Sequence, residues 1–325
     1  MPANPRAPIA IVGNLNVDQW VQTVARFPEW DEELFVDSAR IELAGSAGYL
    51  LQAWRGLGLD AFVSTIGDDA FGAFVGERLA ALGVDPSGVE VLPGEETCLG
   101  MIFVGPGGER GILTALGAHA RMDLGVAERH DRGVGECAEV VLCGGYLLPK
   151  LGPAELLPYA RSLRARRQTV VFDPSWDPGG WSGATRRATL DLLAEVDVYL
   201  PNERELMGVT GADDLDAALR AVEGLAGETV VKRGAAGACH AAGGRRVDAP
   251  GFPVEAVNAI GAGDVFDAGY LHARRLGEPP EGRLRFACAL AAMVVSQRGA
   301  RTYPDAAAVR RFMADGAGSG RIAGR

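Results

Sequence analysis

A glycine-rich turn leads directly into a helix in the stretch Val257-Asn258-Ala259-Ile260-Gly261-Ala262-Gly263-Asp264-Val265-Phe266-Asp267-Ala268-Gly269. Its Gly-Ala-Gly run exposes successive backbone N–H groups with almost no side chain over them. Unpaired N–H groups at a helix N-terminus, together with the positive end of the helix dipole, form an anion site. Asp264 follows this run, where an acid can accept a proton beside a bound phosphate. The pattern favours phosphoryl transfer onto a hydroxyl group.

A structural interpretation of the same stretch stays open at this point. Acidic residues are common in the first turn of helices, because they pair with the free N–H groups there. Glycines often precede helices as well. The rest of the chain therefore has to decide between a cap and a reaction site.

The composition is that of a globular protein whose ligands are small. The chain has 325 residues, 48% of them hydrophobic and 23% charged, and a net charge of −10. This charge excludes a nucleic-acid or anionic-membrane surface, which needs a basic field, but it allows a small anion such as ATP. Neither a CxxC pair nor a histidine spacing typical of zinc sites occurs. The N-terminal MPANPRAP lacks a signal-peptide pattern and no apolar run has membrane-spanning length, so we expect a cytoplasmic protein.

Polar residues follow the first expected strand. Residues 8–13 are a short apolar run typical of a buried parallel strand. The GxGxxG of a dinucleotide site does not follow it, which sets aside an NAD-dependent oxidoreductase. Asn14, Asn16 and Asp18 follow instead, at alternating positions from which they can reach a cleft and bind hydroxyl groups. A simple Asx-turn is the alternative.

Two early segments predict β structure outside the main sheet. Residues 19–43 are strand-like but irregular, and 97–104 and 110–115 form a predicted hairpin within a second segment, 95–117. Later strands, expected at residues 139–143, 169–172, 196–200 and 229–232, alternate with helices, which implies a parallel sheet covered on both faces. We therefore expect an α/β fold with a doubly wound, mostly parallel sheet and a small β-sheet lid. One domain covers residues 1–314, and 315–325 are expected to form a disordered tail.

Two further features are consistent with a nucleotide site. Asn202 and Glu205 open a helix after a strand and can hold Mg²⁺, partly through water; a capping box is the alternative. Lys232, Gly234 and Gly237 form a basic glycine-containing turn that can border a nucleotide, or be a solvated surface turn. Neither the P-loop motif nor the protein-kinase motifs are present in the sequence.

VNAIGAGDVFDAG resembles the C-terminal signature of the ribokinase-like (PfkB) family of carbohydrate and nucleoside kinases. The resemblance extends from IVGNLNVD through AGSAGYLLQAWRGLG, STIGDDAFGAFVGERLAALGVD and LPNERE to VKRGAAG. It implies a doubly wound α/β core with a β-sheet lid, ATP and Mg²⁺ as cofactors, and a sugar, sugar acid or nucleoside as substrate. It also leaves open a homodimer formed through the lid.

The resemblance implies a role for each matching residue. Asp264 would be the base, and Gly261, Ala262 and Gly263 would supply the anion hole. Substrate hydroxyls would be bound by Asn16 and Asp18, with Asn14 nearby and Gly45 and Tyr49 lining the same pocket. Asn202 and Glu205 would manage Mg²⁺ and the triphosphate. The nucleotide would be bordered by Lys232, Gly234, Gly237 and Cys288.

This chain departs from the family pattern at three of these places. Asn258 stands where the family usually has an Asp that organises a monovalent-cation site, so activation by K⁺ stays open. Tyr49 replaces a substrate-contacting Asn, and its ring can stack on a sugar or base or merely fill space. Cys288 replaces a common Asn near the adenine. These changes motivate an alternative, a non-catalytic sugar or nucleotide sensor. The few cations near AGSAG weakly disfavour an already phosphorylated substrate.

Overall fold

Seven strands form the central sheet of the computed structural model, which describes residues 9–22, 24–57, 63–106, 109–298 and 301–316. Their order is β1-β8-β9-β10-β11-β12-β13; neighbours from β1 to β11 run parallel, and β12 and β13 add an antiparallel edge. The strands are β1 (Ile9–Gly13), β8 (Glu139–Cys143), β9 (Thr169–Asp173), β10 (Val198–Tyr199), β11 (Glu228–Lys232), β12 (Ala238–Ala242) and β13 (Arg245–Ala249).

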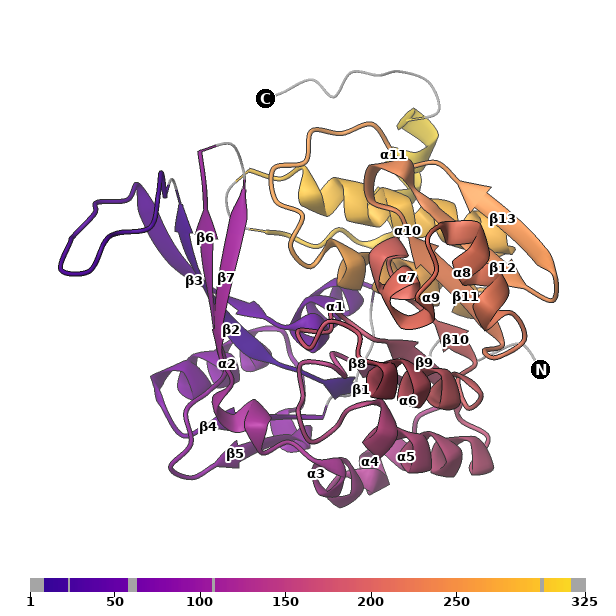
Figure 1. Ribbon diagram of the computed structural model, residues 1–325. Helices are drawn as coiled ribbons and strands as arrows, with labels where there is room; N and C mark the ends of the chain where they lie inside the picture. The colour runs from indigo at the N-terminus through magenta and orange to yellow at the C-terminus, as the bar shows by residue number, and fades with distance from the viewer. Residues whose placement is uncertain (1–8, 23, 58–62, 107–108, 299–300, 317–325) are drawn as a thin grey trace.

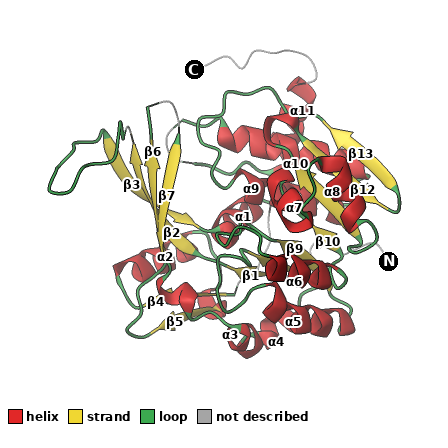
Figure 2. Cartoon of the chain, in the orientation of Figure 1, coloured by secondary structure: helices red, strands yellow, loops and turns green. Residues whose placement is uncertain are grey.

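Helices cover both faces of this sheet because its parallel strands are apolar on both sides (Figure 2). Ile9 and Ile11 of β1 pack into one core, and Ala10 and Val12 pack into the other. The first core is covered by α1 (Ser46–Gly56), α2 (Ala70–Ala81), α9 (Ala262–Arg275), α10 (Pro280–Val295) and α11 (Ala306–Gly316). The second is covered by α3 (Leu124–Arg129), α4 (Asp131–Gly135), α5 (Pro153–Ala165), α6 (Gly183–Leu193), α7 (Glu203–Thr210) and α8 (Leu215–Val222). Among the described residues, no helix is both long and apolar enough to cross a membrane.

A separate four-stranded sheet stands beside the core, at the left of Figure 1. Its order is β3-β2-β6-β7, and its strands are β2 (Asn16–Gln22), β3 (Ser38–Ala44), β6 (Leu99–Val104) and β7 (Arg110–Ala115). A third, two-stranded sheet joins β4 (Ser64–Gly67) and β5 (Val89–Leu92). The predicted fold class, a doubly wound sheet with a small additional sheet, is confirmed.

Some boundaries differ from the expectation. β2 begins at Asn16, so Asn16 and Asp18 belong to the base of the small sheet rather than to a loop after β1. The β12–β13 hairpin, which turns at Gly243-Gly244, was not predicted, although two adjacent glycines between strand-like runs are a hairpin signal. α11 continues to Gly316, past the expected start of the tail at residue 315. The remainder of that predicted tail, 317–325, lies outside the described residues.

Candidate active site

A cavity of about 520 Å³ opens at the carboxyl ends of the parallel strands, where ligands bind in doubly wound folds. Its wall is built by the loops after β9, β10 and β11 and by the helices α9 and α10. Nine residues singled out from the sequence line it: Asn202, Glu205, Lys232, Gly234, Gly237, Ala262, Gly263, Asp264 and Cys288. The fold therefore brings the expected nucleotide, metal and base residues to one cavity.

The start of α9 presents backbone N–H groups to this cavity. Gly261 is the N-cap and has φ 73°, the left-handed conformation that favours glycine. A Cβ at this position would lie 2.6 Å from the ring of Tyr49, so only glycine fits. The amide of Ala262 donates to Ala259 O at 3.2 Å, which removes it from the predicted anion hole unless that bond opens. The N–H groups of Gly261 and Gly263 make no hydrogen bond to any described residue; Gly263 lines the cavity, and Gly261 does not.

Asp264 has the environment of a proton acceptor. Burial and, next, the nearby charge of Asp173 raise the pKa of its carboxyl to about 8. Lys232 and a hydrogen bond with Ser46 oppose this rise. A carboxylate with a raised pKa is a stronger base than an ordinary aspartate. The side chain lines the cavity rather than capping its own helix, so the simple capping interpretation does not account for it.

A buried charge cluster, Asp173, Lys232 and Asp267, lies under Asp264. Lys232 Nζ donates to Asp173 Oδ2 at 3.2 Å and to Asp267 Oδ2 at 2.9 Å. Burial lowers the pKa of the Lys232 ammonium, but the two carboxylates outweigh it and the pKa is raised overall. Lys232 lines the cavity as expected, yet its charge is already paired by protein carboxylates. Sequence reasoning did not identify Asp173 and Asp267 as partners of Lys232, although Asp173 directly follows a predicted strand and Asp267 lies in the quoted glycine-rich stretch.

Asn202 and Glu205 form the capping box of α7. Asn202 N–H donates to Glu205 Oε2 at 2.7 Å, and Glu205 N–H donates to Asn202 Oδ1 at 2.9 Å. Both residues also line the cavity, so the capping role and contact with a ligand coexist. Burial and the charge of Asp173 raise the pKa of Glu205 to about 7.

Asn202 and Glu205 can supply only part of the ligands that a Mg²⁺ ion needs. No three His, Cys, Asp or Glu side chains converge as a metal site within the described residues. Mg²⁺ usually keeps several waters and binds one or two carboxylates together with substrate phosphates. A single buried carboxylate beside Asn202 fits that mode of binding and does not fit an all-protein cage.

The expected substrate residues meet in a buried hydrogen-bond network. Asn16 Nδ2 donates to Asp18 Oδ1 at 2.7 Å, and Tyr49 Oη donates to Asp18 Oδ2 at 2.8 Å. Burial raises the pKa of Asp18 to about 6 against these hydrogen bonds, which lower it. Gly45, with φ 84°, is the N-cap of α1, where a Cβ would meet Asn16 Oδ1.

Asn14 has a structural contact at the same place. Its side-chain oxygen accepts from Ser46 N–H at 3.3 Å, and its backbone carbonyl accepts from Ala47 N–H at 3.1 Å. Asn14 therefore fixes the first turn of α1 beside the Asp18 network. Asn258 likewise organises its turn, because its side-chain oxygen accepts from Ile260 N–H at 3.1 Å.

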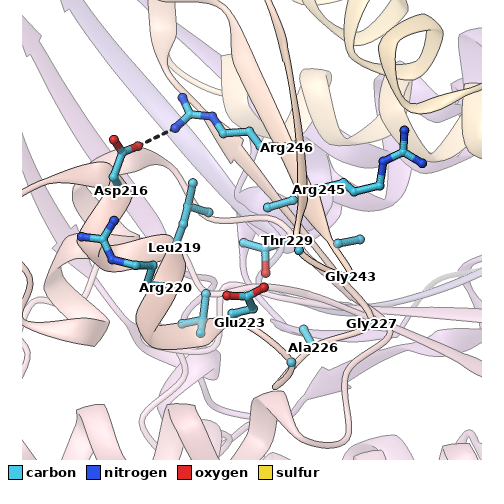
Figure 3. A pocket seen from close by; sticks show the side chains of 15 residues that line it. Asp216, Leu219, Arg220, Glu223, Ala226, Gly227, Thr229, Gly243, Arg245 and Arg246 are labelled. Atoms are coloured by element: carbon cyan, nitrogen blue, oxygen red, sulfur yellow. Dashed lines mark hydrogen bonds and ion pairs between the residues drawn. The ribbon is translucent and has the colours of Figure 1, made fainter.

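A second cavity, of about 470 Å³, lies between α8 and the strands β11 to β13 (Figure 3). It shares no lining residue with the cavity at Asp264. Arg246 on its rim already donates to Asp216 at 2.6 Å and to Asp248, and these side chains are well exposed. Glu223 and Thr229 also line it, but no glycine-rich helix start with free amides lies among its lining residues, so we assign the chemistry to the first cavity.

A doubly wound sheet with a side sheet, and an acid beside a helix N-terminus in its cleft, fits phosphoryl transfer to a small molecule, as in small-molecule kinases. Residues 14–307 match the model of the pfkB family carbohydrate kinases, and the chain belongs to this family. The resemblance found in the sequence is thereby confirmed, and the chain is a carbohydrate or nucleoside kinase.

Individual relatives agree with this assignment. The chain is 30% identical over 312 residues to the ATP-dependent ribose-1-phosphate kinase of Halopiger xanaduensis, covering 93% of this chain and 97% of that protein. It is 30% identical over 284 residues to the cytidine kinase of Thermococcus kodakarensis, covering 83% and 94%. The structure of Arabidopsis thaliana ribokinase complexed with ribose and ATP shares the fold, with a TM-score of 0.78 and 24% identity, over 95% of this chain and 99% of that one.

Proposed function

We propose that this kinase moves the γ-phosphate of ATP to a hydroxyl group of a sugar, sugar acid or nucleoside, with Asp264 as the base. One observation supports this above all others. The Asp264 carboxyl, whose pKa is raised, lines the same cavity as the N-terminus of α9, where Gly261 and Gly263 keep N–H groups free of protein partners. A base and an anion site are thus adjacent.

The reaction follows from these positions. Asp264 accepts the proton of the acceptor hydroxyl as its oxygen bonds to the γ-phosphorus, and the bond from that phosphorus to the β,γ-bridging oxygen breaks. The amides of Gly261 and Gly263 stabilise the charge on the phosphoryl oxygens during transfer. Asp18 and Asn16 orient the acceptor. When bound, Mg²⁺ would neutralise the triphosphate, held through Glu205 and Asn202.

The wall formed by α10 suits the adenine of ATP. Cys288, Ala291, Ala292 and Val295 give this side of the cavity an apolar surface, and Phe252 and Val254 extend it. A thiol in place of an amide removes one polar contact but keeps a surface on which a base can pack. Lys232, Gly234 and Gly237 border the same space, with Lys232 positioning acids rather than pairing directly with phosphate.

ADP release tests this function. The protein is mixed with ATP, Mg²⁺ and, in separate reactions, ribose, deoxyribose, ribose 1-phosphate, 2-dehydro-3-deoxygalactonate or cytidine. We expect ADP formation that depends on one acceptor class and on Mg²⁺.

The changes at Tyr49, Asn258 and Cys288 favour a second candidate, a sensor without turnover. Thermal stabilisation by an acceptor or ATP, with no ADP formed from any acceptor, would establish the sensor instead.

The small sheet, from residues 19–43 and 95–117, would act as a lid and as a dimer interface. β7 is its edge strand and exposes Ile112 and Leu113, each 56% exposed, while Trp30 in the adjoining loop is 98% exposed. An apolar edge strand of this kind is a site for pairing with another chain. We expect a dimer by sedimentation velocity and a monomer for the double substitution Ile112→Lys/Leu113→Lys. A wild-type monomer at high concentration would contradict the interface.

A further inference from the structure

The guanidinium of Arg301 is buried beside the acceptor residues without an anionic partner among the described residues. Its Nε, Nη1 and Nη2 are all shielded from solvent, its hydrogen-bond neighbour is the neutral side chain of Tyr303, and it forms no ion pair with a carboxylate of a described residue. Its Cζ lies 5.1 Å from the centre of the Tyr49 ring, a cation–π contact. Its charge also lowers the pKa of Asp18 and opposes the rise that burial gives to the pKa of Tyr303. The positive charge thus lies close to the acids and phenols of the acceptor side.

The nearby carboxylate does not pair with this cation. Both oxygens of Asp18 accept hydrogen bonds from neutral donors, Asn16 Nδ2 and Tyr49 Oη. A buried guanidinium without a hydrogen-bonded anion is costly, and such a group in a native protein calls for a missing partner. The planar N–H donors of a guanidinium group match the spacing of two oxygens of a phosphate or carboxylate. Arginine therefore binds these anions in a bidentate manner.

From this geometry we infer that Arg301 binds an anionic group, phosphate or carboxylate, carried by the acceptor molecule. The inference rests on the proposed function and narrows its substrate class to sugar phosphates and sugar acids. Arg301 contacts Tyr49 and acts on Asp18, whereas it is absent from the lining of the cavity that holds Asn202, Glu205 and Gly234. Its anion therefore belongs to the acceptor and not to ATP.

Tyr49 acquires a defined role in this arrangement. Its ring lies against Gly261, at the start of α9, and against the guanidinium of Arg301. The ring is therefore occupied by the protein and does not serve to stack a base, one of the two roles expected from the sequence. Arg301, from a distant segment after α10, also places beside Tyr49 a cation that the sequence around AGSAG did not show, which removes the reason for disfavouring a phosphorylated substrate.

Paired acceptors that differ by one anionic group test the inference. Rates are measured for ribose 1-phosphate against ribose, and for gluconate against glucitol, using the wild type, Arg301→Gln and Arg301→Lys. We expect the wild type to prefer the anionic member of a pair. Arg301→Gln should lower kcat/KM for that member by about 10- to 100-fold, the effect of losing a charged hydrogen bond. The KM for ATP and the rate with the neutral member should stay within about threefold, and Arg301→Lys should recover part of the loss. The phosphate and carboxylate pairs show which anion the site takes.

Arg298→Gln is the matched control, since Arg298 is 79% exposed and lies three positions away. It should change none of these rates. Equal use of charged and neutral acceptors by the wild type, or a change confined to the KM for ATP, would overturn the inference while leaving the kinase function intact.

A binding measurement that begins with the wild-type protein keeps the test independent of turnover. Inorganic phosphate should stabilise the wild-type protein thermally without ATP, and should compete with the acceptor. This stabilisation should be lost in Arg301→Gln and retained in Arg298→Gln. If no acceptor is phosphorylated but phosphate still binds through Arg301, the proposed function fails and the anion site stands. If phosphate neither stabilises nor competes, the anion site fails.

Discussion

Asp264→Asn is expected to lower kcat by about 10²- to 10⁴-fold, the usual contribution of a positioned acid–base group. The amide has nearly the shape of the carboxyl but cannot accept the acceptor's proton. The start of α9, the free amides of Gly261 and Gly263, and the apolar wall for the nucleotide remain in place. The Kd for ATP, measured by calorimetry, should therefore change little. A variant that keeps more than about a tenth of the wild-type kcat would rule out Asp264 as the base.

The pH dependence of the same reaction gives an independent signature. The pKa of Asp264 is raised to about 8 by burial and by Asp173, so the carboxyl is partly protonated at neutral pH. A base has to be ionised, and kcat should therefore rise with pH through this range and level off above it. In Asp264→Asn this limb should disappear. Glu203→Gln is the control, because Glu203 is an acid in the first turn of α7 that does not line the cavity.

The sequence predicted the layers of this fold because burial on both sides of a parallel strand leaves a continuous apolar run. The strands at residues 139–143, 169–172 and 229–232 are found within a residue of the expected bounds. Short elements without such a run, α3 and α4, were missed. The start of β2 at Asn16 was not predicted. Alternating polar residues such as Asn14, Asn16 and Asp18 occur both in loops after a strand and within strands, so the sequence did not distinguish the two.

The candidate site was predictable where its residues share one local segment. The run from Gly261 to Asp264 is such a case, because a helix start fixes both the amides and the acid. Contacts between distant segments left no local pattern: Lys232 meets Asp173 and Asp267 across 59 and 35 positions. Arg301 reaches Tyr49 from the other end of the chain. The pairing of charges, and hence which cations remain for a ligand, therefore required the structure.

Lys232→Met is expected to cost about 3–5 kcal/mol of unfolding free energy, because it leaves two buried carboxylates without their cation. Lys232 Nζ contacts Asp173 and Asp267, and the Asp267 side chain is fully buried. Lys150→Met, at the chain's one other lysine, lies at an exposed position and should change stability by less than about 0.5 kcal/mol. Denaturant unfolding of both variants at pH 7 measures the difference.

The pH dependence and a double variant separate charge from packing in this cluster. Burial already raises the pKa of Asp267, and removing Lys232 raises it further since the ammonium lowers it. A carboxyl whose pKa is raised in the folded state adds stability that is present at low pH and lost as pH rises through that pKa. The deficit of Lys232→Met should therefore be smaller at pH 5 than at pH 8, and Lys232→Met/Asp267→Asn should recover part of it. A deficit independent of pH and unchanged in the double variant would mean that Lys232 acts through packing alone.

Since Lys232 also lowers the pKa of Asp264, the rising limb of kcat should move to higher pH in Lys232→Met, which links the buried cluster to the base.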